Sequence, residues 1–396
     1  MSSSLPFITL LPKREKSLIN RHPWVFSGAI AKLPPKLANG DAVDVLAADG
    51  RWLGTGFYSP KSQISVRIFD FEAQGSAHTT AAYWAAKIAN ALHLRQQYVA
   101  TAATNAYRLL HAEGDWMPGL IADVYANVLV VQIGTKGMQL IWPLLAEAFA
   151  SLGFAHIYLK VDKGAHQVEG VTLAEGWAAD KKPKGALQIL ENGLKFQVDI
   201  LNGQKTGFFL DQRDARLLLK QYAPGRKVLN TFSYSGGFSI YALAGGATAA
   251  ISVDVSAEAI ALADANAKLN GMEAQHTGIT SDVFEYLDKM DETFDMIVLD
   301  PPAFAKRSAD AQRAARGYKQ LNLAAFRKIK QGGIVFTFSC SHHIDRDLFR
   351  KIVFSAAADS GRQVRILHQT TQSPDHPISI YHPEGEYLKG LVLEVS

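Results

Sequence analysis

Cysteine is nearly absent from this sequence, because Cys340 is the only one among 396 residues. An internal disulfide is therefore excluded, and the cysteine content gives no indication of secretion. The N-terminal stretch MSSSLPFITLLPKREK has no positively charged segment before its short apolar run, so we expect no signal peptide. No run approaches about 18 uninterrupted apolar residues, so we expect no membrane-spanning helix and no membrane partner. These absences favour a cytoplasmic protein.

Charge of one sign is not in large excess either. The net charge of +4 is too small to indicate nucleic-acid binding by itself. The cations are nevertheless clustered in two stretches, with six between Lys13 and Lys36 against the single acid Glu15, and eight between Ala303 and Lys330 against Asp310. Two basic clusters could flank one polyanion, although each cluster alone is equally compatible with a solvated face.

The pattern of apolar segments predicts three domains, over residues 1–76, 77–185 and 186–396. The first contains short apolar segments separated by turn signals such as Asn39-Gly40 and Asp49-Gly50, which favours a small β-rich barrel or sandwich. The second alternates helical and strand patterns and is expected to be α+β. In the third, nearly all-apolar strands alternate regularly with helices, which is typical of an α/β domain whose parallel sheet is covered on both faces.

Polar residues at the predicted carboxyl ends of the strands in the third domain indicate a ligand site. The glycine loop Asn230–Gly237 lacks the Gly-x-Gly-x-x-Gly fingerprint of dinucleotide-binding folds, which disfavours a nicotinamide oxidoreductase. Gly236 still allows close approach of a ligand to the backbone. Asp254 is placed to accept hydrogen bonds from ribose hydroxyls and Asp282 from an adenine amino group. This set fits S-adenosylmethionine (SAM), although either aspartate alone could be an ordinary strand-end or capping carboxylate.

The next strand ends in Asp300-Pro301-Pro302, and Phe304 comes after the intervening Ala303. Proline cannot continue a strand ladder, so the chain must leave the sheet at Asp300 and form a rigid turn beside the ligand crevice. Phe304 could stack on a base. Asp/Asn-Pro-Pro followed by an aromatic residue is a signature of methyltransferases that act on nucleobases, where the aspartate accepts from an amino group. A plain strand terminator is the alternative.

Cys340 ends the following strand, in FTFSCS, so we expect it to face the same crevice as Asp300. Carbon 5 of a pyrimidine is a poor nucleophile, and a thiolate that adds to carbon 6 activates it. A lone cysteine is more often a small core residue, but this one lies at a strand end between two serines. His342 and His343 could assist the thiol or bind phosphate, and an exposed loop is the simpler interpretation of both.

With these motifs the sequence resembles the bacterial ribosomal RNA large subunit methyltransferase I family of RNA 5-methylcytosine methyltransferases. The resemblance extends over the whole chain and includes REKSLINRHPWVFSGAI, YSPKSQISVRIF, KTGFFLDQRDAR, VLNTFSYSGGFS, LDPPAF, RGYKQLN, FTFSCS, DHP and YLKG. It implies a Rossmann-like class I methyltransferase domain, preceded by a small β-rich PUA domain that binds RNA and a middle α+β domain.

The resemblance also implies roles for individual residues. SAM would be held by Asp211, Arg213, Asn230, Tyr234, Gly236, Asp254, Asp282 and Asp300. Asp300 would orient the target cytosine and Cys340 would attack it. Many related enzymes carry a second cysteine after the Asp-Pro-Pro-like motif to help product release. This chain has Ala303 there, so another, unidentified base must act.

RNA contacts are expected from Lys13, Arg14, Arg21, Lys306 and Phe304. The sequence therefore predicts a SAM-dependent enzyme that methylates cytosine C5 in large-subunit ribosomal RNA. An RNA amino- or ring-nitrogen methyltransferase that does not use Cys340 and a non-catalytic PUA RNA-binding protein remain as alternatives. We expect no bound metal. The sequence leaves open the target nucleotide, naked RNA or an assembled particle as substrate, and whether the chain forms a homodimer.

Overall fold

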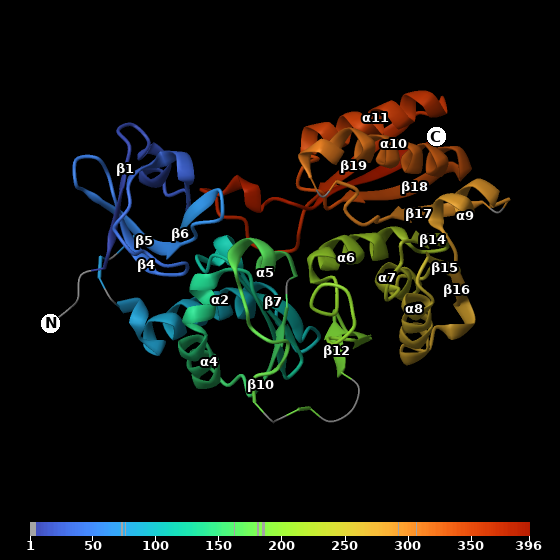
Figure 1. Cartoon of the computed structure of the whole chain (residues 1–396). Coiled ribbons are helices and arrows are strands. Elements are labelled where there is room, and N and C mark those ends of the chain that lie inside the picture. The colour runs from blue at the N-terminus through green and yellow to red at the C-terminus, as the bar shows by residue number, and fades with distance from the viewer. Residues whose placement is uncertain are drawn as a thin grey trace. The chain divides into compact units, whose positions relative to one another are not determined.

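The computed structural model of the chain describes residues 5–72, 74–75, 77–161, 163–179, 182–183, 187–291, 293–305 and 307–396. The chain folds into two compact units, which Figure 1 shows with their elements labelled. The first comprises Met1–Ile189, Val198–Phe208 and Pro374–Gly385, and the second Leu190–Gln197, Phe209–Ser373 and Glu386–Ser396. The first unit thus holds both domains predicted before residue 186, and the domain bounds themselves stay a prediction.

A six-stranded sheet forms within residues 5–72, in the order β2-β6-β5-β4-β1-β3. Neighbouring strands in this sheet are antiparallel, except for β1 and β4, which are parallel to each other. Alternating apolar residues such as Val43, Val45, Val66 and Ile68 point into one core, which confirms the β-rich N-terminal domain. The elements are β1 (Phe7–Leu10), α1 (Lys16–Ile19), β2 (Trp24–Phe26), η1 (Ser27–Ala29), β3 (Ile30–Lys32), β4 (Ala42–Leu46), β5 (Trp52–Tyr58) and β6 (Ile64–Asp70).

The expected α+β domain follows. Its sheet has the order β11-β10-β9-β8-β7 in the described chain, and helices α2 and α4 pack together beside it. The buried face of α2 carries Trp84, Ile88 and Ala91 at helical spacing. The elements are η2 (Ala77–Thr79), α2 (Ala81–Tyr98), β7 (Ala106–His111), η3 (Ala112–Asp115), β8 (Leu120–Tyr125), β9 (Val128–Ile133), α3 (Lys136–Leu140), α4 (Trp142–Ser151), β10 (His156–Lys160), α5 (Lys163–Glu169) and β11 (Gly176–Trp177).

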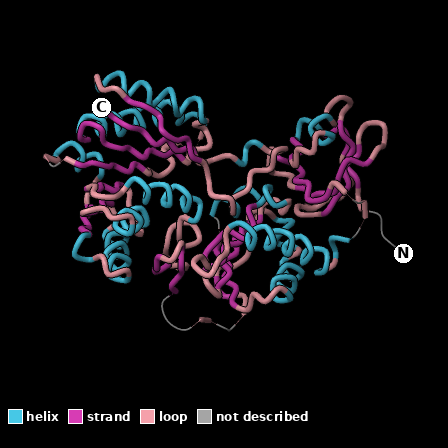
Figure 2. Tube along the Cα trace, turned by 180° about the vertical axis from the view of Figure 1, so that it is seen from behind, coloured by secondary structure: helices cyan, strands magenta, loops and turns pink. Residues whose placement is uncertain are grey.

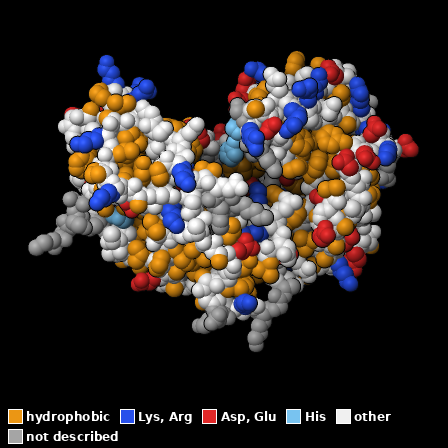
Figure 3. All heavy atoms as spheres, in the orientation of Figure 1, with side chains coloured by type: hydrophobic (Ala, Val, Ile, Leu, Met, Phe, Trp, Pro, Cys, Tyr) orange, Lys and Arg blue, Asp and Glu red, His pale blue; other side chains and the backbone are white. Residues whose placement is uncertain are grey.

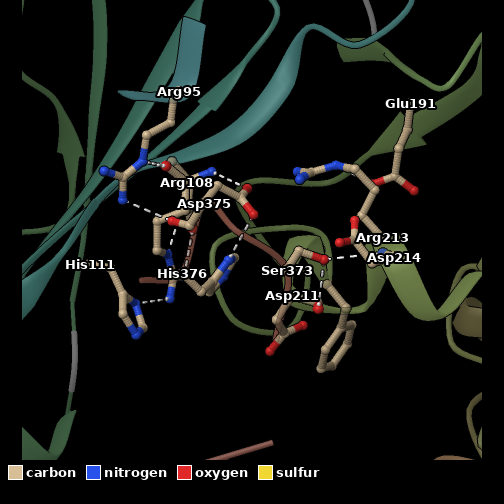
Figure 4. Close-up of polar contacts among 12 residues, drawn as sticks. Arg95, Arg108, His111, Glu191, Asp211, Arg213, Asp214, Ser373, Asp375 and His376 are labelled. Atoms are coloured by element: carbon tan, nitrogen blue, oxygen red, sulfur yellow. Dashed lines mark hydrogen bonds and ion pairs between the residues drawn. The ribbon is translucent and has the colours of Figure 1, made fainter. Parts of the chain in front are cut away.

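A segment from near the C-terminus, Pro374–Gly385 with η7 (Pro383–Gly385), belongs to the first unit. Buried charges hold it there. The Asp375 carboxylate accepts from the Arg108 backbone N–H at 2.9 Å, and its carbonyl accepts from the Arg95 guanidinium at 2.9 Å, as Figure 4 shows. Arg95 and Arg108 are themselves paired with Asp115 and Asp123. The aspartate of the DHP motif therefore has a structural role.

The second unit contains a seven-stranded sheet over the described residues from 227 onward, in the order β16-β15-β14-β17-β18-β20-β19. The strands are parallel except β20, which runs antiparallel to both of its neighbours. Figures 1 and 2 show helices on both faces, with α6, α7 and α8 on one side and α9, α10 and α11 on the other. The two apolar clusters lie between these helix layers and the sheet. The Rossmann-like fold is thereby confirmed.

The second unit's elements begin with the hairpin β12–β13, whose tip Leu190–Gln197 is the part assigned to this unit. Helix α8 has Ser256 as its N-cap, whose side chain accepts from the Ala259 N–H at 3.1 Å, and Gly271 with φ 69° follows the helix. The elements are β12 (Leu187–Glu191), β13 (Leu194–Val198), η4 (Leu210–Gln212), α6 (Arg213–Tyr222), β14 (Lys227–Thr231), α7 (Gly237–Ala244), β15 (Ala249–Asp254), α8 (Ala257–Leu269), η5 (Glu273–Gln275), β16 (His276–Thr280), α9 (Val283–Lys289), β17 (Phe294–Leu299), η6 (Ser308–Asp310), α10 (Ala311–Lys328), β18 (Ile329–Ser339), α11 (Arg346–Ser360), β19 (Val364–Thr370) and β20 (Lys389–Val395).

Among the described residues, no helix has both the length and the apolar character that crossing a membrane requires.

A buried ion cluster fixes the start of α6 in the second unit. Glu191 is fully buried and accepts two hydrogen bonds of 2.8 Å from the Arg216 guanidinium and one of 3.0 Å from Tyr241. The Nε atom of Arg213 lies 3.6 Å from the same carboxylate. Removing the carboxylate would take the buried acid away from two buried arginine side chains, which is strongly destabilising.

We therefore expect Glu191→Ala to lower the free energy of unfolding of the second unit by about 3–5 kcal/mol. Urea unfolding should be followed by circular dichroism, because all six tryptophans lie in the first unit. The matched control is Glu285→Ala, which removes an exposed carboxylate 3.0 Å from Lys289 and should change stability by less than about 0.5 kcal/mol. Equal, small effects of both substitutions would contradict the structural role of Glu191.

Candidate functional site at the carboxyl edge of the sheet

The register of the parallel strands aligns their carboxyl ends in the second unit. Thr231 of β14 lies opposite Leu299 of β17, and Leu299 lies opposite Thr337 of β18. The glycine loop, the Asp-Pro-Pro turn and the Ser-Cys-Ser segment therefore leave the sheet at the same edge. This is where ligands bind in doubly wound sheets.

The loop after β14 adopts an unusual backbone. Phe232 and Tyr234 have positive φ angles of 53° and 43°, and Gly236 follows with φ 74° at the start of α7. An added Cβ at Gly236 would lie 2.8 Å from the Cβ of Ala263, so only glycine fits there. The backbone strain at two non-glycine residues is of the kind found at ligand sites.

Asp254 ends β15, as the sequence predicts, and braces this loop. Its carboxylate accepts from the Tyr234 N–H at 2.9 Å and from the Ser256 N–H at 3.0 Å. Asp282 directly follows Ser281, whose N–H donates to the Asp254 carbonyl at 2.9 Å. This hydrogen bond brings Asp282 close to the end of β15. Asp282 itself caps α9 by accepting from the Glu285 N–H at 3.1 Å. Both aspartates thus have structural partners as well as the positions expected for ligand contacts.

The buried side chain of Asn230 indicates that the edge of the sheet fits a ligand with hydrogen-bond donors. Its side chain is 1% exposed, and its amide nitrogen donates to Ser239 at 3.0 Å. The amide oxygen Oδ1 is buried and has no hydrogen-bond partner within the described part of the chain. Buried acceptors are normally satisfied. A ligand that donates a hydrogen bond here, as SAM can, fits this site.

Asp211 and Arg213 are buried where η4 meets α6. The Asp211 carboxylate accepts from the Tyr387 hydroxyl at 2.6 Å. Figure 4 shows the Ser373 hydroxyl donating to the Asp211 carbonyl at 3.0 Å and accepting from the Asp214 N–H at 3.1 Å. Arg213 lies beside Glu191, as described above. Both predicted residues are therefore held rigidly by neighbours within the second unit.

The Asp-Pro-Pro turn is fastened to the cysteine segment through Ser341. Strand β17 ends at Leu299, so the chain leaves the sheet at Asp300 as expected. The Ala305 N–H donates to the Ser341 hydroxyl at 3.3 Å, and the Tyr318 hydroxyl lies 3.0 Å from the same oxygen. Phe304 is half-buried, with its ring centroid 4.7 Å from that of Tyr318. Hydrogen bonds thus join the Asp-Pro-Pro turn to Ser341, the residue after Cys340.

Cys340 is half-buried and directly follows β18. One face packs against the apolar cluster under α6 and α7, and the residue is not sealed inside it. His342 and His343, which follow it, are exposed. Neighbouring protein atoms still desolvate the His342 ring in part, and this desolvation, together with the charges of Lys389 and His343, lowers the pKa of His342. The neutral imidazole is therefore the main form of His342 at neutral pH.

Lys389 is a neighbour of Cys340 that the sequence analysis missed. It begins β20 opposite Ser339, is 3% exposed, and donates to the carbonyls of Ser341 and Tyr387 at 2.7 Å each. Burial lowers the pKa of Lys389 to about 8, and negative charge on Cys340 is the largest effect that opposes this shift. A buried ammonium group next to the thiol favours the thiolate. The antiparallel pairing that creates this contact has no signal near Cys340 in the sequence.

Three of the basic residues predicted to contact RNA, Lys13, Arg14 and Arg21, lie on the N-terminal domain. Lys13, Arg14 and Lys16 line a surface hollow of about 360 Å³ together with Phe26, whose side chain is 48% exposed. Figure 3 shows Lys and Arg side chains on the drawn face of this domain among apolar and uncharged ones, with few acidic neighbours. Arg21 pairs with Glu72 and lies over the Phe71 ring. Lys306 lies outside the described residues.

Comparisons with known proteins identify both parts of the chain. A family model described as S-adenosylmethionine-dependent methyltransferase matches residues 143–374, and a PUA-like domain model matches residues 8–71. Proteins named ribosomal RNA large subunit methyltransferase I are 42% identical in Aeromonas salmonicida, over 98% of both chains, and 43% identical in Shewanella amazonensis, over 98% of this chain and 99% of that one.

The chain belongs to the ribosomal RNA large subunit methyltransferase I family. It carries a SAM-dependent methyltransferase domain after a PUA-like domain, as the sequence predicts. The crystal structure of SMU.776 in complex with SAH has the same fold, with a TM-score of 0.83, 23% identity, and coverage of 98% of this chain and 99% of that one. Within the described residues, no group of three or more His, Cys, Asp or Glu is arranged to hold a metal ion.

Lys389→Met should slow alkylation of Cys340 by iodoacetamide about ten-fold at pH 7, because one pKa unit of thiolate stabilisation corresponds to a factor of ten. The measurement is specific to this thiol, since the chain has no other cysteine. The ammonium form of Lys389 predominates below pH 8 and is lost above it. The difference between the two proteins should therefore shrink as the pH rises through about 8.

Lys330→Met is the matched control, because Lys330 lies near the opposite end of β18 and pairs with Asp295 at the surface. It should leave the alkylation rate unchanged. If Lys389→Met reacted at the wild-type rate across this pH range, Lys389 would have no influence on the thiol.

Proposed function

We propose that this protein methylates carbon 5 of a cytosine in large-subunit ribosomal RNA, through a transient covalent bond between Cys340 and carbon 6. Its curated relatives are named ribosomal RNA large subunit methyltransferase I and match over nearly the whole chain. The single observation that carries the finer proposal is the position of the only cysteine. It is half-buried beside a buried lysine and is fastened through Ser341 to the Asp-Pro-Pro turn.

The chemistry requires the thiolate. The Cys340 sulfur forms a bond to carbon 6 of the cytosine, and carbon 5 gains the character of an enamine carbon. Bound SAM supplies a methyl group on a sulfonium centre. After carbon 5 has been methylated, a base removes its proton, the bond between sulfur and carbon 6 breaks, and the thiolate is restored. Lys389 would stabilise the thiolate at the start and at the end of this sequence.

Asp300 would orient the cytosine by accepting a hydrogen bond from its amino group. The residue follows directly on β17, and the rigid proline pair after it limits its movement. A base in a folded RNA must leave its stack to reach this edge of the sheet, at a cost of a few kcal/mol. Phe304, which is held against Tyr318, would offer the extruded base or its neighbour a stacking surface.

The cofactor would be held by the loop after β14 and by the neighbouring strand ends. We assign its amino-acid end to Asn230, Tyr234 and Gly236, its ribose to Asp254 and its adenine to Asp282. Asp211, Arg213 and Asp300 would complete the enclosure. The buried unsatisfied oxygen of Asn230 supports a ligand with a hydrogen-bond donor at this point.

RNA would be held by phosphate contacts on the N-terminal domain. Lys13 and Arg14 line the same hollow as the exposed Phe26, which combines charge with a stacking surface. Arg21 and Lys306 would add further phosphate contacts. An enzyme acting on ribosomal RNA in a bacterium would work in the cytoplasm.

Cys340→Ala should abolish 5-methylcytosine formation and leave SAH binding within about two-fold of wild type, because the substitution removes the nucleophile and little else. The substrate is large-subunit RNA from cells that lack the protein, and product nucleosides are identified by mass spectrometry after digestion. Thr337→Val, which changes a buried hydroxyl on β18, the strand that Cys340 follows, is the control expected to retain turnover. Full turnover by Cys340→Ala, or a product methylated on nitrogen, would refute the covalent mechanism.

The double substitution Lys13→Ala/Arg14→Ala should weaken RNA binding and make it less dependent on salt. Each lost phosphate contact removes about 0.7–0.9 from the slope of log K against log salt concentration, so the slope should fall by about 1.5. Fluorescence anisotropy with a single-stranded RNA across a salt series measures this. Lys61→Ala, on an exposed lysine between β5 and β6, serves as the control. An unchanged slope in the double variant would exclude this hollow from the RNA interface.

A further inference from the structure

A continuous chain of polar side chains crosses β16, β15 and β14 beneath the glycine loop. The Nδ1 atom of His276 lies 3.0 Å from the Asp264 carboxylate, and its Nε2 atom lies 2.8 Å from the Ser252 hydroxyl. The hydroxyls of Ser252 and Ser239 are 2.7 Å apart, and the Asn230 amide nitrogen donates to Ser239 at 3.0 Å. Of these five residues only Asp264, at one end, reaches the surface.

Sheet register and a glycine make this chain of contacts feasible. Ser252 of β15 lies directly opposite Asn230 of β14, so both side chains project on the same face of the sheet. Gly278 of β16 leaves room for the carboxylate over His276, because an added Cβ there would lie 2.8 Å from Oδ1 of Asp264. The arrangement therefore depends on a side-chain-free position two residues after His276.

The protons in this chain can point in only one direction while His276 is neutral. Burial lowers the pKa of His276, and the charge of Asp264, the titratable group in contact with the ring, opposes this shift. The carboxylate only accepts, so Nδ1 carries the proton and Nε2 accepts from Ser252. Ser252 must then accept from Ser239, and Ser239 must accept from the amide nitrogen of Asn230.

This order of hydrogen bonds fixes the orientation of the Asn230 side-chain amide. Its nitrogen is turned toward Ser239, so its oxygen is the end presented away from the relay. That oxygen is one of the buried acceptors that have no hydrogen-bond partner within the described residues. An asparagine with the opposite orientation would present its NH₂ group there and would repel a cation.

We propose that Asp264, His276, Ser252 and Ser239 form a positioning relay that locks the Asn230 amide with its oxygen toward the ammonium group of bound SAM. This inference rests on the proposed role of Asn230 in cofactor binding. The relay residues do not touch the cofactor themselves. They act by excluding the orientation of Asn230 that would oppose binding.

The test is calorimetry with two ligands, SAH and its analogue without the α-amino group. Asn230→Ala should weaken SAH binding at least ten-fold and leave the analogue within about two-fold, because only SAH loses a charge-assisted hydrogen bond. Ser239→Ala should weaken SAH binding by about two- to five-fold, since the amide then samples both orientations. Thr337→Val removes a buried hydroxyl outside the relay and should change neither affinity.

Asn230→Asp provides the rescue. A carboxylate is an acceptor in either orientation, so in this background Ser239→Ala should cause no further loss of SAH affinity. Thermal unfolding of each variant verifies that it is folded. If Asn230→Ala does not fold, the comparison of Ser239→Ala with and without Asn230→Asp still tests the relay.

Two results would overturn the inference in separate ways. Equal losses for SAH and the analogue in Asn230→Ala would show that Asn230 does not meet the ammonium group. A Ser239→Ala protein that binds SAH as tightly as Thr337→Val would refute the relay while leaving the role of Asn230 intact. Neither result depends on methyl transfer, so both are distinct from a failure of the Cys340 mechanism.

Discussion

The register of the seven-stranded sheet is the constraint on which the candidate site depends. Because β14, β17 and β18 run parallel and in step, three chemically different segments emerge at one edge. A shift by one residue in either pairing would turn each strand-end side chain to the opposite face. The apolar runs of these strands are buried against helices on both sides, and this burial fixes the register. The precision of the site is therefore a property of the core.

Much of this arrangement could be predicted from the sequence, because its signals are local. Asp254, Asp300 and Cys340 follow apolar strand patterns directly, and the structure places all three where those strands end. The cap at Ser256 was equally predictable, since a helix signals its start within a few residues. Asp282 was expected near a strand end, and its role as the cap of α9 is an addition to that expectation.

The features that the sequence did not predict all arise from contacts between distant segments. Lys389 reaches Cys340 only because β20 returns antiparallel beside β18. Glu191 contacts α6 through the tip of a hairpin, and His276 reaches Asn230 through two serines on different elements. A histidine at the start of one strand and a lysine at the start of another are individually unremarkable. Their chemistry follows from which neighbours surround them after folding.

Several polar groups at the carboxyl edge of the sheet lower the stability of the free protein. A buried acceptor without a partner costs about 1–3 kcal/mol, and a buried ammonium group such as that of Lys389 is costly unless a negative charge compensates for it. Proteins usually remove such features unless a ligand or a reaction needs them. On our proposal both costs are relieved in function, since a bound ammonium group satisfies Asn230 and the thiolate of Cys340 compensates Lys389. The same polar atoms that weaken the free protein would then provide binding energy for the cofactor and a reactive sulfur for the cytosine.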